Sequence, residues 1–155
     1  YLIMGQHFLP ESLIYAGSRT GSRRVLEQYV DTVLEGLSTG AYSCLCHPDL
    51  VDFAGDGAFY RKQMRRLCEG VKKMGIPLEI NLLGLGEGRH YPNERFWTIA
   101  GETGNRAIIG VDAHDPASIG KHRIFEAALA LAERCGLEVE ERMEFSATAP
   151  WRQRL

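Results

Sequence analysis

The sequence alternates short apolar runs with longer segments of helical periodicity. Four runs are almost continuously apolar, without the polar alternation that marks a strand with one solvated face: YLIMG, AYSCLC, IPLEINLL and RAIIGV. In the segments that follow them, apolar residues recur at three- and four-residue spacing, which predicts helices over 22–38, 57–74, 92–103 and 121–135. Strands buried on both faces and separated by helices are typical of a parallel α/β fold.

A weaker alternating run, LEVEERMEF over 137–145, predicts one further strand. The 155 residues and 45% hydrophobic content suffice for one globular domain, and no linker or low-complexity segment divides the chain. Tyr1 opens the chain inside an apolar run without an initiator methionine. We therefore expect the sequence to be a piece of a longer polypeptide.

Composition narrows the functional classes. Lysine and arginine number 18 against 20 aspartates and glutamates, a formal net charge of -2, which disfavours nucleic acid as a partner. The apolar stretches fall far short of the roughly 20 residues that cross a bilayer, so no membrane partner is expected. No targeting leader opens the chain, and the four cysteines lack the spacing of a disulfide framework. These features predict a cytoplasmic protein with reduced thiols.

Polar side chains able to bind metal fall where each predicted strand ends. His7 follows YLIMG, His47 follows AYSCLC, and Glu79 lies within IPLEINLL. Asp112 and His114 follow RAIIG. The successive intervals from His7 to Asp112 are 40, 32 and 33 residues, close to the ~30 residues of one strand-helix unit. Because parallel strands end at a common edge, we expect these side chains to meet.

Asp112 and His114 are spaced so that both can reach one ion. Residues two apart on an extended chain point to the same side, and imidazole nitrogen with carboxylate oxygen suits Zn, Mn or Fe. The alternative is that Asp112 or Asp115 caps the following turn and that His114 is an ordinary loop residue. Single histidines are commonly structural as well, but metal-capable groups at four strand ends favour a shared site.

Two arginines are candidates for binding phosphate. Arg89, in GEGRHYP, follows a strand on the expected active face, and its guanidinium offers a planar fork that matches phosphate oxygens. Arg19, in GSRTGSRR, lies on a neighbouring loop. The alternative for both is a solvated loop charge. The glycine-rich stretch over 84–88 is interpreted as a turn, and His90 and His122 are expected at the surface.

These motifs resemble those of the polymerase-and-histidinol-phosphatase (PHP) metallohydrolases, and among them the histidinol-phosphate phosphatases. The resemblance covers nearly the whole chain in the family's order, through GQHFL, CHPDLVDF, PLEINLLGL, GRHYPNERF and GVDAHDPASIG. It implies a distorted (βα) barrel with a two- or three-metal centre of Zn, Fe or Mn at the C-terminal mouth. Residues 1–155 would form the C-terminal portion of that single domain, because the family's N-terminal H-x-H strand has no counterpart here.

The resemblance also assigns roles to individual residues. The implied metal ligands are His7, His47, Asp112 and His114. Asp112 and His114 are also the candidate catalytic pair, Arg89 and Arg19 would bind substrate, and Glu79 and Asn81 would support the site. A barrel that lacks its first strands exposes sheet edges, so self-association through those edges is expected, together with little activity from this portion alone.

The implied function is hydrolysis of a small phosphate monoester, with L-histidinol phosphate of histidine biosynthesis as the leading substrate. Two alternatives stay open. One is a PHP phosphoesterase that acts on nucleotides. The other is a noncatalytic binding module whose metal site has degenerated.

Overall fold

The computed structural model describes residues 1–10 and 12–143, and in this part of the chain five strands form one parallel sheet in the order β1-β2-β3-β4-β5. The strands are β1 (Leu2–Met4), β2 (Tyr42–Leu45), β3 (Leu78–Asn81), β4 (Arg106–Gly110) and β5 (Glu138–Val139). Each pairs in parallel with the next along the chain. The predicted α/β fold with a parallel sheet is confirmed. The last two residues of the predicted final strand, 144–145, lie outside the described residues.

Helices connect the strands close to the predicted ranges. They are α1 (Arg23–Ser38), α2 (Gly57–Lys73), α3 (Leu82–Gly86), α4 (Glu94–Thr103) and α5 (His122–Arg134), with a short 3-10 helix at Pro116–Ser118. Side chains of Ser22, Asp56 and Asn93 accept backbone N–H bonds at the first turns of α1, α2 and α4. Gly104 ends α4 in the left-handed conformation. Sequence patterns thus located the long helices to within a few residues.

The run IPLEINLL differs from its prediction as one strand. The strand stops at Asn81, whose side chain accepts the backbone N–H of Gly84 at 2.9 Å and so caps the start of α3. The stretch interpreted as a turn is therefore partly helical. This early stop leaves Asn81 at the end of the strand, beside the candidate site.

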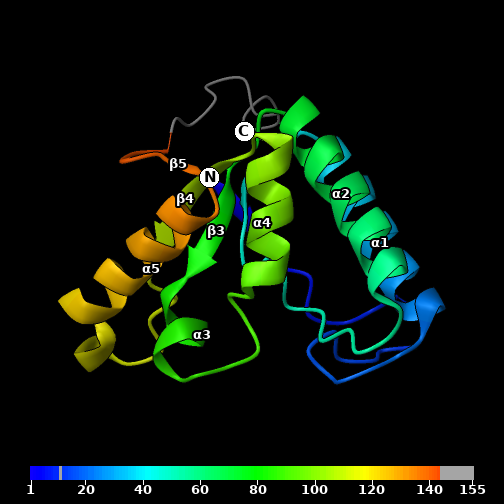
Figure 1. The fold of residues 1–155 in the computed structure, drawn as a ribbon, viewed down its shortest axis with the longest axis horizontal. Coiled ribbons are helices and arrows are strands. Elements are labelled where there is room, and N and C mark those ends of the chain that lie inside the picture. The colour runs from blue at the N-terminus through cyan, green and yellow to red at the C-terminus, as the bar shows by residue number, and fades with distance from the viewer. Residues whose placement is uncertain (11, 144–155) are drawn as a thin grey trace, which may run out of the picture.

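The long helices pack side by side against the sheet. Figure 1 shows α5, α4, α2 and α1 following one another across the molecule, in the reverse order of the chain. Contacts join α1 to α2, α2 to α4, and α4 to α5. The largest fully buried side chains include Trp97, Tyr29, Phe96, Leu26, Met64 and Ile80. This core fixes the strands whose ends carry the candidate site.

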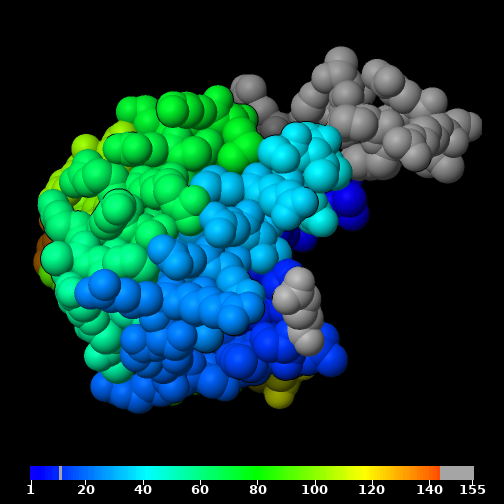
Figure 2. Space-filling view, turned by 90° about the vertical axis from the view of Figure 1, so that its right-hand side faces the viewer, coloured from blue at the N-terminus to red at the C-terminus, as the bar shows by residue number. Residues whose placement is uncertain are grey.

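One edge of the sheet is formed by β1. Its apolar residues Leu2 and Ile3 are each 46% exposed, and Tyr1 is 63% exposed. Figure 2 shows that the molecule is hollowed on the side where these N-terminal residues lie. Within the described residues, no helix combines the length and the apolar character that a membrane span requires.

Candidate functional site at the strand ends

Six of the predicted site residues lie in one row along the C-terminal edge of the sheet. Contacts run from His7 to His47, from His47 to Glu79, through Asn81 to Asp112, and on to His114. Four strands contribute, as parallel topology requires for groups that follow β1, β2, β3 and β4. The structure therefore places together six residues that are spread over 108 positions of the sequence.

His7 and His47 form the first pair of the row. Their ring centroids lie 4.8 Å apart in an edge-to-face arrangement. His47 is buried, and its Nδ1 has no hydrogen-bond partner among the described residues. Burial lowers the pKa of His47 to about 4, and the neighbouring His7 acts in the same direction. At physiological pH the His47 imidazole is therefore neutral and keeps a free nitrogen lone pair.

Gly5 makes room for this pair. A Cβ at Gly5 would lie 2.9 Å from Cys46 Sγ, 3.0 Å from a ring carbon of His7 and 3.1 Å from a ring carbon of His47. Cys46 itself lies with Sγ 3.5 Å from His47 Nε2. Any larger residue at position 5 would push the imidazoles away from their present positions.

Glu79 and Asn81 link the histidine pair to Asp112. Glu79 Oε2 accepts the backbone N–H of His47 at 3.0 Å and the Asn81 side-chain amide at 3.1 Å. The same amide nitrogen donates to Asp112 Oδ2 at 3.1 Å. Burial raises the pKa of Glu79, while its hydrogen bonds from Asn81 and His47 lower it. These two side chains hold the ends of three neighbouring strands in register.

Asp112 and His114 form the second pair, with Asp112 Oδ1 3.4 Å from His114 Nε2. The His114 side chain is 74% exposed, whereas that of Asp112 is 33% exposed. Asp115, by contrast, accepts the N–H of Ala117 at 2.8 Å and caps the 3-10 helix. The turn is therefore capped by Asp115, and Asp112 is left facing the row.

Backbone strain coincides with two of the predicted ligands. His47 has a φ of 31° and Asp112 a φ of 48°, both in the left-handed region that residues other than glycine seldom adopt. Such a conformation costs about 1–2 kcal/mol per residue. Strained residues of this kind cluster at functional sites, where the surrounding structure holds them in place.

Of the two candidate arginines, Arg89 lies near the row. Its guanidinium pairs with Glu87 at 2.6 Å and donates to the Tyr91 hydroxyl at 2.8 Å. The Tyr91 ring lies 5.9 Å from the His47 ring between centroids. Arg19, with a side chain 75% exposed, lies 3.8 Å from Asp52 on the loop before α1. Among the described residues, this ion pair connects Arg19 to a surface carboxylate and not to the row.

Sequence reasoning missed a clamp that holds the loop after β2 against the loop before α4. The buried Asp49 accepts the backbone N–H of Asn93 at 2.5 Å, and His90 Nε2 lies 2.6 Å from the carbonyl oxygen of Leu50. His90 is thus partly buried and not the free surface residue that was expected. The only sequence signal for the clamp was an acid two residues after His47.

We expect Asp49 to make the stability of the metal-free protein depend on pH. Burial raises its pKa to about 7, against hydrogen bonds that lower it. Because the unfolded chain releases this proton near pH 4, the free energy of unfolding should fall between pH 4 and pH 7, by on the order of 4 kcal/mol, and then level off. Urea titrations in chelator should show this slope reduced in Asp49→Asn. Parallel curves for the two proteins would contradict the assignment.

The row contains donors suited to a divalent metal of the kind that the resemblance implies. They form two pairs, His7 with His47 and Asp112 with His114. The described residues hold no group of three or more His, Cys, Asp or Glu side chains already arranged around one point. The two pairs are nevertheless joined by the Glu79–Asn81 bridge, and the buried Nδ1 of His47 lacks a partner. Such an atom is one that a cation or a water satisfies. The donors fit a metal in chemistry and location, as two pairs and not as a finished cage.

Comparison of the chain with known proteins does not assign it to a family. No model of a known protein family matches the chain, and no curated protein matches it. Function is therefore inferred from the strand-end residues themselves.

Proposed function

We propose that the protein is a metal-dependent phosphate monoester hydrolase of the PHP type, whose sheet is part of a (βα) barrel. The observation that carries the proposal is the continuous row of contacts from His7 to His114 across four strand ends. Barrel enzymes keep their chemistry at this edge. In such a barrel, residues 1–155 are the C-terminal portion, and the exposed edge of β1 pairs with a further strand or a second copy of the chain.

His7, His47 and Asp112 would hold the metal, which is Zn, Mn or Fe by donor type, and His114 beside them is left for proton transfer. When bound, such an ion lowers the pKa of a water ligand and stabilises charge on phosphoryl oxygens. The protein contributes orientation. Glu79 fixes the backbone of His47, and Asn81 fixes the carboxylate of Asp112. Removing a residue that hydrogen-bonds a metal ligand typically lowers metal affinity or activity by roughly 10- to 100-fold.

Arg89 is the candidate phosphate-binding residue. Its guanidinium already pairs with one carboxylate, that of Glu87, and is held by the Tyr91 hydroxyl. A phosphate group can present two oxygens to a guanidinium, as a carboxylate can, and it can replace or share that partner. The Tyr91 contact directs the guanidinium toward the His47 side of the site.

The pair of Asp112 and His114 is suited to proton transfer. The exposed imidazole of His114 has the Asp112 carboxylate 3.4 Å away, which orients the ring. A protonated His114 can give its proton to the departing alkoxide of the ester. We assign His114 as the general acid and Asp112 as the residue that orients it.

L-histidinol phosphate is the leading substrate, and the cytoplasm is the proposed location. The motifs that resemble histidinol-phosphate phosphatases support the first assignment. The four free thiols support the second, because reduced cysteines persist in that compartment.

The test is phosphate release by the full-length protein from L-histidinol phosphate and from mononucleotides, with Mn²⁺, Zn²⁺ or Fe²⁺ added separately. We expect release from L-histidinol phosphate that a chelator lowers at least ~10-fold and that the same metal restores, because the hydroxide supply depends on the ion. A preference for mononucleotides would replace the substrate assignment. If no ester is hydrolysed and no metal binds in equilibrium dialysis, the site is a noncatalytic module.

A further inference from the structure

A cavity lies beside the candidate site, on the far side of α3 from Tyr91. It has a volume of about 520 Å³ and lies between α3, the loop after β4 and the start of α5. Its lining is largely apolar and includes Leu82, Leu83, Val111, Ala117, Ile124 and Phe125. Cavities of roughly 300–1,000 Å³ with apolar walls and a few polar groups are typical binding sites for small molecules.

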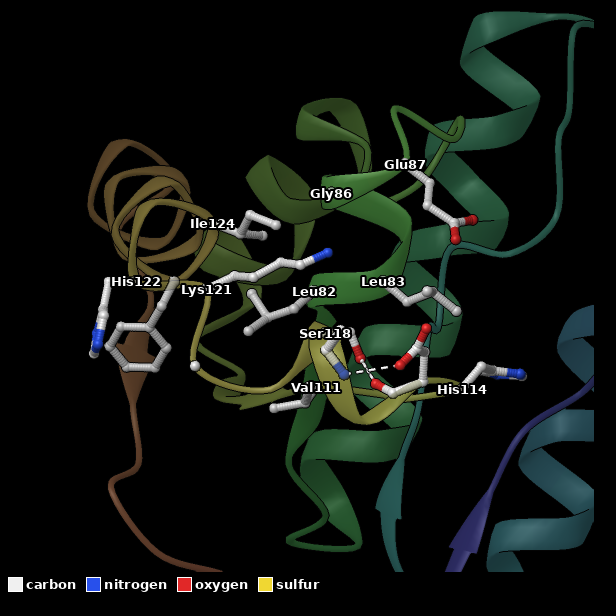
Figure 3. Close-up of a pocket in the computed structure, with 14 residues that line it drawn as sticks. Leu82, Leu83, Gly86, Glu87, Val111, His114, Ser118, Lys121, His122 and Ile124 are labelled. Atoms are coloured by element: carbon white, nitrogen blue, oxygen red, sulfur yellow. Dashed lines mark hydrogen bonds between the residues drawn. The ribbon is translucent and has the colours of Figure 1, made fainter.

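Two of the lining residues also belong to the candidate site. His114 lines the cavity and lies 3.4 Å from Asp112, while Glu87 lines it and pairs with Arg89. Figure 3 shows His114 and Glu87 on the same side of the pocket, opposite to His122. The cavity therefore opens next to the proposed general acid and the proposed phosphate-binding arginine.

Polar and charged side chains line the cavity as well, among them Ser118, Lys121 and His122. Glu87 is neutralised by Arg89, and Asp115 is bonded to the N–H of Ala117 in its own turn. Figure 3 shows Lys121 extending from the α5 side toward α3, with its stem passing over Leu82. The ammonium of Lys121 ends beside α3, so a cation faces the cavity together with the apolar side chains.

We infer that this cavity receives the organic group of the phosphate ester, and that it selects an aromatic or branched group over a small alkyl one. The inference rests on the proposed function and assigns the place where the organic group of the substrate binds. A phosphoryl group held by Arg89 and His114 would bring its organic group to the cavity, because His114 and Glu87, the partner of Arg89, both line it. An apolar ring or branched chain then gains burial against Leu82 and Ile124, which a methyl group cannot reach.

The test fills the cavity without touching the site. Ala117→Leu adds three carbons to an exposed residue of the lining, and Ala127→Leu adds the same carbons to an exposed residue of α5 outside the lining. We expect Ala117→Leu to raise the ratio of KM for phenyl phosphate to KM for methyl phosphate about 10-fold. The substitution removes binding of the ring that is equal in the ground state and the transition state, so KM changes and kcat does not. Ala127→Leu should leave this ratio unchanged. Circular dichroism confirms that both variants fold.

A second measurement separates the cavity from the chemistry. Phenol is titrated into ¹⁵N-labelled protein, and we expect shifts at the amides of Leu82 and Ile124 that Ala117→Leu abolishes. If neither ester is hydrolysed but these shifts are seen, the proposed function is wrong, whereas binding of an aromatic group in the cavity is confirmed. If phosphate is released and Ala117→Leu leaves the KM ratio unchanged, the inference is overturned. It is equally overturned if phenol shifts neither amide.

Discussion

Asp112→Asn should lower kcat/KM for phosphate-monoester hydrolysis by about two orders of magnitude or more, with little change in fold. Asparagine has the shape of aspartate and tolerates the left-handed backbone found at this position, where φ is 48°. Its amide oxygen can still accept the hydrogen bond from Asn81. What is lost is the negative charge that, under the proposed function, would bind a metal ion and orient His114. Steady-state kinetics on the metal-loaded, full-length protein measure the effect.

Asp31→Asn is the matched control for this substitution. Asp31 lies on α1 with a side chain 62% exposed, and its ion pair with Arg66 is at the surface, where such pairs are worth about 0–1 kcal/mol. Its kinetics should stay within about twofold of the parent protein, since the lost surface charge is far from the row. Retention of full activity by Asp112→Asn would remove Asp112 from the mechanism.

Gly110→Ala should destabilise the protein by about 3 kcal/mol and disrupt the site at the same time. A Cβ at Gly110 would lie 1.8 Å from Glu79 Oε1, inside the space of a buried side chain on the neighbouring strand. The β3–β4 register pairs Gly110 with Asn81, so the backbone there cannot move apart without breaking the sheet. Displacing Glu79 also releases the backbone of His47, to which it is bonded. Denaturant unfolding measures the stability, and the phosphatase assay measures the site.

Gly57→Ala provides the comparison for a glycine that has room. The nearest atom to a Cβ at Gly57 is 3.8 Å away, and the residue is the first of α2. Alanine should leave stability unchanged or raise it by about 0.4–1 kcal/mol, since it limits the unfolded chain. Equal stability of the Gly110→Ala and Gly57→Ala proteins would show that Glu79 does not occupy the space next to β4.

The sequence predicts which side chains gather at the strand ends, because their gathering follows from the parallel topology alone. Parallel strands separated by helices place their C-terminal ends at one edge, whatever the details of packing. For that reason, the positions of His7, His47 and Asp112 in the sequence already predicted that they would meet. Arg19 was harder to place, because its loop is held by a pairing of Thr20 with Phe53 that no sequence pattern showed, and its side chain lies 3.8 Å from Asp52.

Other features depend on contacts that no local pattern carries. The apolar stretch after Asn81 suits a strand or a helix equally, and the side-chain bond from Asn81 to Gly84 decides in favour of the helix. The burial of Asp49 requires the loop at Asn93, 44 residues later, to fold over it. The cavity beside α3 exists only because α3 and α5 pack against each other. Such long-range packing is absent from the periodicity of the sequence.

The left-handed backbone at His47 and Asp112 implies a trade-off between robustness and chemistry in this protein. Glycine at either position would relax the backbone, but at His47 it would leave a buried position empty, and at Asp112 it would remove the acceptor of the Asn81 hydrogen bond. Under the proposed function, these two positions therefore give up backbone freedom in exchange for a metal donor.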